Sequence, residues 1–158
     1  MPSPISPAAL DELARFLGAG PSMILGTRDE RMSPALVRCA GARLVDGRVR
    51  AVVPLPEGER ALANIASNGS VALSAAIPTT YRTLQVKGRD AQVIDWPDGA
   101  AASLEHLDAF SKEVVVGGFH EALARHFWSS ERFVSIAFTP DELYDQTPGP
   151  RAGLAVGT

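Results

Sequence analysis

Apolar residues along the chain fall into patterns typical of short strands and of amphipathic helices. Alternating or continuous apolar runs predict six strands, at residues 22–28, 35–45, 48–53, 71–77, 82–94 and 132–138. Apolar residues at helical spacing predict helices at residues 7–17, 57–67, 97–116 and 119–127. Asp46-Gly47, between the second and third strands, is a strong hairpin signal, so these two strands are expected to pair antiparallel.

The order of these elements predicts the fold class. Many short strands with an early hairpin favour a small antiparallel barrel, closed or partly closed. Gly18-Ala19-Gly20 follows a helix rather than a strand, so it is not a dinucleotide-binding turn. We therefore predict an α+β, mainly β protein, a six-stranded antiparallel barrel with flanking helices. Its 158 residues suit a single domain (1–158), with disorder expected at 1–5 and 152–158.

Composition narrows the class of function. Fifteen basic and eighteen acidic residues give a net charge of −3, which provides no basic footprint for nucleic acid. No apolar run approaches the roughly 20 residues of a membrane span, and Met1-Pro2-Ser3-Pro4 does not resemble the start of a signal peptide. Cys39 is the single cysteine, so an internal disulfide is impossible. These observations predict a cytoplasmic protein that binds neither nucleic acid nor membranes.

Residues 78–88, Pro-Thr-Thr-Tyr-Arg-Thr-Leu-Gln-Val-Lys-Gly, carry the most informative polar pattern. Side chains alternate across a strand, so Tyr81, Thr83, Gln85 and Lys87 are expected to share one face, with the intervening apolar residues in the core. A row of hydrogen-bond donors beside a tight turn suits a polar, flat, partly anionic ligand. Flavin mononucleotide (FMN) is such a ligand.

Three segments, at residues 60–73, 80–88 and 145–150, resemble the pyridoxamine 5'-phosphate oxidase-like, FMN-binding split-barrel family. The resemblance extends over residues 23–153. It implies that the barrel is a split barrel and that FMN lies at the interface of a homodimer. It also implies an oxidoreductase in which the flavin supplies the redox chemistry for a small-molecule substrate. The substrate, the electron donor and any catalytic acid or base stay open.

Two arginines are the main candidates for binding the cofactor phosphate. Arg60 is expected in the first turn of a helix, where free backbone N–H groups and the helix dipole favour an anion. The family commonly has Ser-Arg-Lys here, whereas this chain has Glu59-Arg60-Ala61, so deazaflavin and haem remain alternatives to FMN. Arg38 lies in an otherwise apolar segment and must face solvent, a partner subunit or an anion. The alternatives are a solvated arginine at position 60 and a sheet-edge charge at position 38.

The remaining cofactor candidates lie on the neighbouring strands and turn. The resemblance implies that the Gln85 amide contacts the flavin, and an amide offers both the donor and the acceptor that a ring edge requires. Lys87 shares the face of Gln85 and is a further candidate for the phosphate. Val53 and Pro54 are expected to supply backbone contacts to the ring, and Thr80 a hydroxyl at the turn. For Gln85 the alternative is a solvent-facing side chain. For Lys87 it is a solvated charge or a charge that blunts a sheet edge, and for Thr80 a hydroxyl that bonds its own backbone.

Other reactive residues form no familiar catalytic or metal-binding motif. His120 and His126 are six residues apart, which does not place them on one helical face, and no cysteine or carboxylate cluster completes a zinc site. We therefore predict no metal site, with a haem-binding role for His106, His120 or His126 as the alternative. Cys39 is expected in the core. A non-catalytic module that binds flavin or haem is the alternative to an enzyme, and a plain dimeric scaffold is a third hypothesis.

Overall fold

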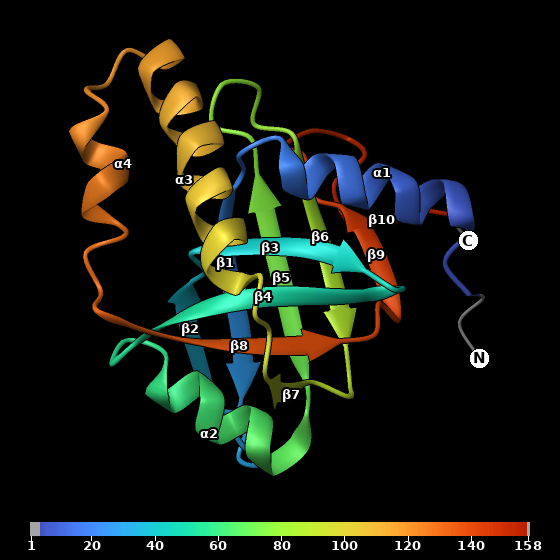
Figure 1. Ribbon diagram of the computed structural model, residues 1–158. Helices are drawn as coiled ribbons and strands as arrows, with labels where there is room; N and C mark the ends of the chain where they lie inside the picture. Colours follow the sequence, from blue (N-terminus) through green and yellow to red (C-terminus); the bar gives the residue numbers. More distant parts are fainter. Residues whose placement is uncertain (1–3, 158) are drawn as a thin grey trace.

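The computed structural model describes residues 4–157, which form four helices and two antiparallel sheets (Figure 1). The helices are α1 (Pro7–Gly18), α2 (Glu59–Asn68), α3 (Gly99–Val116) and α4 (Ala122–His126). The six-stranded sheet contains, in spatial order, β10 (Leu154–Ala155), β9 (Glu142–Asp145), β6 (Thr83–Gly88), β5 (Val71–Ala76), β1 (Ser22–Arg28) and β2 (Pro34–Arg38). The four-stranded sheet contains β3 (Gly41–Val45), β4 (Arg48–Leu55), β8 (Arg132–Phe138) and β7 (Gln92–Ile94).

The two sheets face each other and enclose one main core. Leu25 and Leu73 from the six-stranded sheet meet Val49 and Ile136 from the four-stranded sheet there, and all four side chains are fully buried. In Figure 1 the strands of the four-stranded sheet cross in front of those of the six-stranded sheet. The predicted mainly antiparallel architecture with flanking helices is confirmed. The strand count was wrong, because the described residues form ten strands rather than six.

The chain passes from one sheet to the other at Cys39 and Ala40. The Cys39 N–H donates to the Met23 carbonyl of β1 at 3.1 Å, whereas the Ala40 N–H donates to the Val52 carbonyl of β4 at 2.9 Å. The strand predicted at residues 35–45 is therefore two strands, β2 and β3. The crossing was concealed because the residues around it, Cys39 to Ala42, are all small and buried and carry no turn signal of their own.

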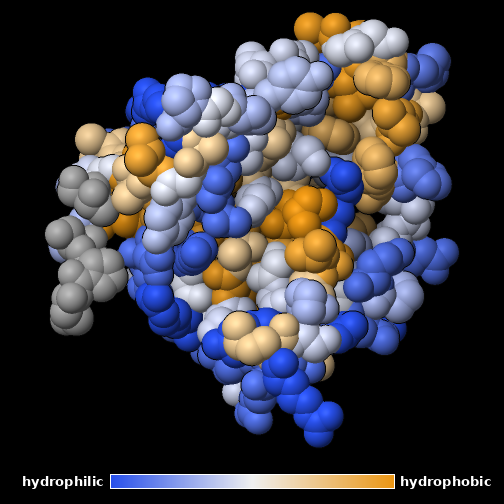
Figure 2. Space-filling model, turned by 180° about the vertical axis from the view of Figure 1, so that it is seen from behind, coloured by the Kyte–Doolittle hydropathy of each residue, from blue (hydrophilic) through white to orange (hydrophobic). Residues whose placement is uncertain are grey.

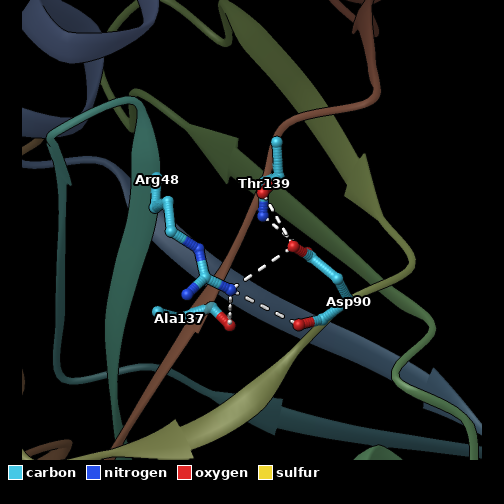
Figure 3. Close-up of polar contacts among 4 residues, drawn as sticks. All are labelled: Arg48, Asp90, Ala137 and Thr139. Carbon is cyan, nitrogen blue, oxygen red and sulfur yellow. Dashed lines mark hydrogen bonds and ion pairs between the residues drawn. The ribbon is translucent and has the colours of Figure 1, made fainter.

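A second crossing, between β6 and β7, divides the strand predicted at residues 82–94. Asp90 lies in this connection and accepts hydrogen bonds from the backbone N–H and the hydroxyl of Thr139, both at 2.7 Å (Figure 3). Arg48 Nη2 lies 3.4 Å from the same carboxylate and 3.3 Å from the Ala137 carbonyl. Partial burial acts to raise the pKa of Asp90, but the Thr139 hydrogen bonds and the Arg48 charge outweigh it, so the pKa is lowered. The ionised Asp90 thus ties the crossing to the end of β8.

The C-terminal segment pairs with the six-stranded sheet. Leu154–Ala155 pair with Asp145 and Tyr144 of β9, and the Gly157 carbonyl accepts from the Ser6 N–H at 2.9 Å. Residues 152–157, for which disorder was expected, are described with this backbone pairing, which the Gly- and Pro-rich sequence does not suggest. Ile5 packs against the core. Residues 1–3 and 158, also expected to be disordered, lie outside the described part of the chain.

The helices cover the edges and one outer face of this assembly. Ser6 caps α1, as predicted, by accepting the Ala9 N–H at 3.4 Å. Helix α3 packs on the four-stranded sheet, where a Cβ on Gly41 would approach the Ser103 Cα to 3.1 Å, so glycine permits this close contact. Helix α4 is shorter than the predicted 119–127. Among residues 4–157, none of the helices has the length and apolar character that a membrane crossing requires.

Candidate cofactor-binding site

The outer face of the six-stranded sheet joins two of the predicted cofactor contacts in one row. The register pairs Arg38 of β2 with Ile24 of β1. It pairs Ile24 in turn with Ser74 of β5, and Ser74 with Gln85 of β6. Directly paired residues in antiparallel strands point to the same face. Arg38 and Gln85 therefore share this face, three strand spacings or roughly 15 Å apart.

Small residues form the floor on either side of this row. Gly26 pairs with Ala72 on one side, and Ser22 pairs with Ala76 on the other. None of these flanking side chains extends beyond a hydroxymethyl group. Within the row itself, the side chains of Ile24 and Ser74 lie between Arg38 and Gln85. A planar molecule laid along the row would therefore contact an apolar Ile24 side chain near its middle.

Arg38 is held by two contacts at the end of β2. Its Nη1 donates a hydrogen bond to the Ser22 hydroxyl at 2.6 Å. Its guanidinium lies over the ring of Phe127, with Cζ 4.2 Å from the ring centroid. Phe127 directly follows α4, so this short helix positions the ring.

The charge of Arg38 has no carboxylate partner within residues 4–157. The side chain is half-buried, and burial lowers the pKa of Arg38 from its usual value while the neighbouring Cys39 partly opposes that change. A partly desolvated guanidinium normally pairs with an anion. Arg38 retains N–H donors that are available to bind such an anion.

Two cavities open on Arg38. The first, of about 320 Å³, is lined by Pro54 and by the serines Ser129 and Ser130. The second, of about 530 Å³, extends from Ser22 and Ala76 on the sheet to the C-terminal part of α3 and the segment that follows it. Of the sequence-predicted residues, Pro54 is thus brought directly beside Arg38.

Gln85 and Lys87 lie on the same outer face, as their alternation predicted. The Gln85 Nε2 donates to the Ser74 hydroxyl at 3.0 Å, which fixes the amide while leaving its carbonyl oxygen and second N–H for a ligand. The Lys87 ammonium lies 4.8 Å from the centroid of the Tyr144 ring. Tyr81 does not join them. It lies in the turn before β6 with a φ of 59°, so its expected place in the strand was wrong.

Three predicted contacts lie away from the row. Arg60, in the first turn of α2, is exposed and donates to the Ser33 hydroxyl at 2.6 Å, beyond the opposite end of β2 from Arg38. Thr80 lies in an exposed turn and accepts the Arg82 N–H at 3.3 Å, which is the local bond that turn threonines usually make. The Val53 side chain is fully buried between the sheets, so only its backbone is left for a ligand.

Cys39 and His106 lie behind this site and are chemically quiet. Burial raises the pKa of Cys39 to about 12, so the thiol stays protonated, in the core position that the sequence predicted. Burial also lowers the pKa of His106 to about 4, against a small opposing effect of the Pro21 carbonyl. The neutral imidazole stacks with Phe110 and Trp128 at centroid distances of 6.3 and 5.6 Å. No group of three metal-binding side chains occurs in residues 4–157.

Apolar side chains surround the outer face of the six-stranded sheet. Leu36 on β2 is 71% exposed, and Val116 and Phe119, at and beyond the end of α3, are 76% and 63% exposed. Figure 2 shows the molecule from behind, with a hollow near its centre and an apolar cluster at the upper right, where α3 ends. Exposed apolar side chains thus border this face of the sheet.

Comparison with known proteins identifies the fold. No protein-family model matches the sequence, and no curated protein matches it. Solved structures do match. HupZ of group A Streptococcus is 15% identical, covering 90% of this chain and 98% of its own, with a TM-score of 0.53. An F420 reductase is 18% identical, with coverages of 82% and 93% and a TM-score of 0.52. HutZ, a haem storage protein of Vibrio cholerae, is 10% identical, with coverages of 85% and 92% and a TM-score of 0.50.

These neighbours have the split-barrel fold, and the chain shares it. Because the identities are between 10% and 18%, the likeness concerns the fold and not the ligand. The split-barrel expectation is therefore confirmed at the level of fold.

Proposed function

We propose that the protein binds a phosphorylated flavin, FMN or a deazaflavin, on the outer face of the six-stranded sheet. The observation that carries this proposal is Arg38, a half-buried guanidinium without an ion-pair partner in residues 4–157, at one end of a row of outward-facing side chains that leads through Ile24 and Ser74 to Gln85. Arg38 would hold the phosphate with Ser129, and Gln85 would meet the ring edge. The Ser130 hydroxyl in the same cavity donates to the Glu57 carboxylate at 3.2 Å, so it is not among the phosphate donors. These donor types fit the two ends of such a cofactor.

The fold neighbours support a planar cofactor. One is named an F420 reductase, and another is named a haem storage protein. When bound, a flavin supplies the redox chemistry, which would make this protein an oxidoreductase acting on a small molecule. The residues of the chain orient the cofactor and exclude water. Neither Cys39 nor His106 is suited to proton transfer here, because the buried thiol keeps its proton and the buried imidazole stays neutral.

A homodimer completes the proposed site. The outer face of the six-stranded sheet is open, and the exposed Leu36, Val116 and Phe119 border it. A second copy laid over these side chains would remove them from water and close the cofactor row, as an isologous interface does. Dimerisation and cofactor binding are therefore expected to occur on the same face.

Haem binding is the second candidate. His126 lines the same cavity of about 320 Å³ as Arg38, so an imidazole and a guanidinium lie close together there. An axial imidazole and a cation for a propionate are what haem would require. The two candidates differ in colour, since flavin absorbs in the blue and haem gives a Soret band.

The visible spectrum of the purified protein and matched titrations test the proposal. FMN, F420 and haemin are titrated in turn, with the oligomeric state followed by light scattering. Arg38→Gln should weaken flavin binding by about 10- to 100-fold, because a charged hydrogen bond to phosphate is lost. Arg60→Gln, the control at the other end of β2, should change it by less than about threefold.

Three outcomes would reject parts of this proposal. If Arg60→Gln loses as much flavin affinity as Arg38→Gln, or more, the phosphate binds at the first turn of α2, as the sequence first suggested. If the unsubstituted protein binds haemin but no flavin, and His126→Ala abolishes haemin binding, the second candidate is established. A colourless protein that binds none of the three cofactors would leave only the hypothesis of a plain dimeric scaffold.

A further inference from the structure

A second cavity lies on the opposite side of the molecule, on the outer face of the four-stranded sheet. It has a volume of about 560 Å³ and is bounded by β4, β8 and the first half of α3. Val52 and Ser135, which pair directly across β4 and β8, form part of its floor. None of the seven residues predicted to bind the cofactor lines it.

Aromatic side chains held in place by the fold form its walls. Trp96 is 6% exposed and packs with Ala40 and Val52 in a small core of its own. The Trp128 indole N–H donates to the Ala40 carbonyl at 2.8 Å and to the Ser103 hydroxyl at 3.1 Å. Since its one donor is satisfied within the fold, the Trp128 ring offers the cavity an apolar surface of fixed orientation.

The mouth of the cavity is apolar and open to solvent. Leu104 of α3 is 67% exposed and Phe133 of β8 is 41% exposed, and both line the cavity. A void left by imperfect packing would be enclosed and small. This cavity is instead concave, accessible and mostly apolar, and its volume lies within the roughly 300–1,000 Å³ typical of small-molecule sites.

The polar groups of the cavity define the charge of its ligand. Asp95 is the one charged residue that lines it, and the Ser135 hydroxyl adds a neutral partner. The Ser103 hydroxyl donates to the Ala40 carbonyl at 3.0 Å and accepts from Trp128, so it retains only acceptor capacity for a ligand. Neither lysine nor arginine contributes to the lining, so a phosphate or a carboxylate would find no cation and would meet the Asp95 charge. The chemistry here is the reverse of that around Arg38.

We propose that this cavity is a binding site for a planar aromatic molecule that carries no negative charge. The ligand lies between the Trp96 and Trp128 walls and reaches Ser103 or Ser135 with one polar group. The site is separate from the proposed flavin site, so it stands whether or not the protein binds a flavin.

The two tryptophans provide a direct readout, because they are the only two in the chain and both line the cavity. In ¹⁵N-labelled protein their indole N–H signals can be followed by NMR during titration with 1-naphthol. The same titration with 1-naphthyl phosphate keeps the ring and adds a negative charge. We expect 1-naphthol to shift both indole signals saturably, and the phosphate to bind at least tenfold more weakly.

A pair of neighbouring substitutions locates the binding. Ala100 lines the cavity and is exposed, so Ala100→Phe should fill the mouth without disturbing the core and weaken 1-naphthol binding at least tenfold. Ala101 is equally exposed on α3 and does not line the cavity, so Ala101→Phe should leave binding unchanged. Circular dichroism confirms that both variants are folded.

The absence of saturable shifts would overturn the proposal. So would equal binding by Ala100→Phe, or tighter binding of the phosphate than of 1-naphthol. Indole shifts that depend on protein concentration alone would show instead that this face binds a second copy of the chain.

Discussion

The outer faces of the two sheets differ in character although both sheets share one core. The face of the six-stranded sheet presents Arg38, Gln85 and Lys87 around a row that includes Ile24 and is flanked by small side chains. The face of the four-stranded sheet is covered by α3 and encloses a cavity walled by Trp96 and Trp128. The comparison shows that α3 covers one face within the chain, leaving a cavity beneath it, while no element of the described chain covers the middle of the other face.

The difference follows from what packs on each sheet. Gly41 allows α3 to approach β3 closely, and the indole N–H of Trp128 joins β3 to α3 through Ala40 and Ser103. No helix of residues 4–157 lies across the middle of the six-stranded face in the same way (Figures 1 and 2). Stability should therefore depend strongly on the packing of α3 against the four-stranded sheet. Binding of the proposed flavin should depend on the residues of the six-stranded face.

The largest expected effect on stability comes from Trp128. Trp128→Ala should lower the free energy of unfolding by about 3–4 kcal/mol, because the aromatic contacts with His106 and Phe110 are lost and a cavity remains. Urea denaturation followed by circular dichroism measures the change. Trp128→Phe should lose about half as much, since it keeps the packing and removes the indole N–H. A loss below 1 kcal/mol for the alanine variant would show that α3 is held by other contacts.

The second prediction concerns pH, through the buried His106. Its pKa is about 4 in the folded protein and 6.5 ordinarily, so below pH 6.5 the unfolded chain binds a proton that the folded protein does not. The stabilisation is complete above pH 6.5 and is lost as the pH falls to about 4, by on the order of 3 kcal/mol. His106→Phe should lack this component in unfolding free energies measured between pH 4.5 and 7.5. Identical pH profiles for the two proteins would contradict it.

The smallest effect is expected for the ion pair between Arg43 of β3 and Glu105 of α3. The Glu105 side chain is 70% exposed and that of Arg43 is 36% exposed, so water and salt screen the pair. Arg43→Met should change the free energy of unfolding by no more than about 0.5 kcal/mol. Urea denaturation at low and high salt measures it. A loss above 1.5 kcal/mol would show that charge, rather than apolar packing, holds α3 to the sheet.

The sequence predicted the local elements well and their pairing less well. The capped start of α1 and the hairpin at Asp46-Gly47 depend on neighbouring residues, and both are present. The crossing at Cys39 depends on contacts with β1 and β4, which are distant in sequence. One local sign of the crossing is a change of phase in the alternation. The inward-facing residues Val37 and Cys39 are at odd-numbered positions, whereas the inward-facing Ala42 of β3 is at an even-numbered one.

The candidate site was also predicted only in part, because some of its features depend on a single strand and others on contacts between distant segments. The alternation in β6 placed Gln85 and Lys87 on one face, since it needs only the geometry of a single strand. The row from Arg38 to Gln85 depends on the order β2-β1-β5-β6, which no local pattern contains. Phe127 was missed as the partner of Arg38, because it comes from a segment almost ninety positions further along the chain.

The joint at Cys39 and Ala40 also sets where the chain tolerates a change of length. One residue inserted there would turn β3 over, so that Arg43 would face the core and Ala42 and Leu44 would face α3. The same insertion beside Gly47, at the exposed tip of the β3–β4 hairpin, would only lengthen a turn. Natural or engineered insertions should therefore be found at that tip and not at the joint.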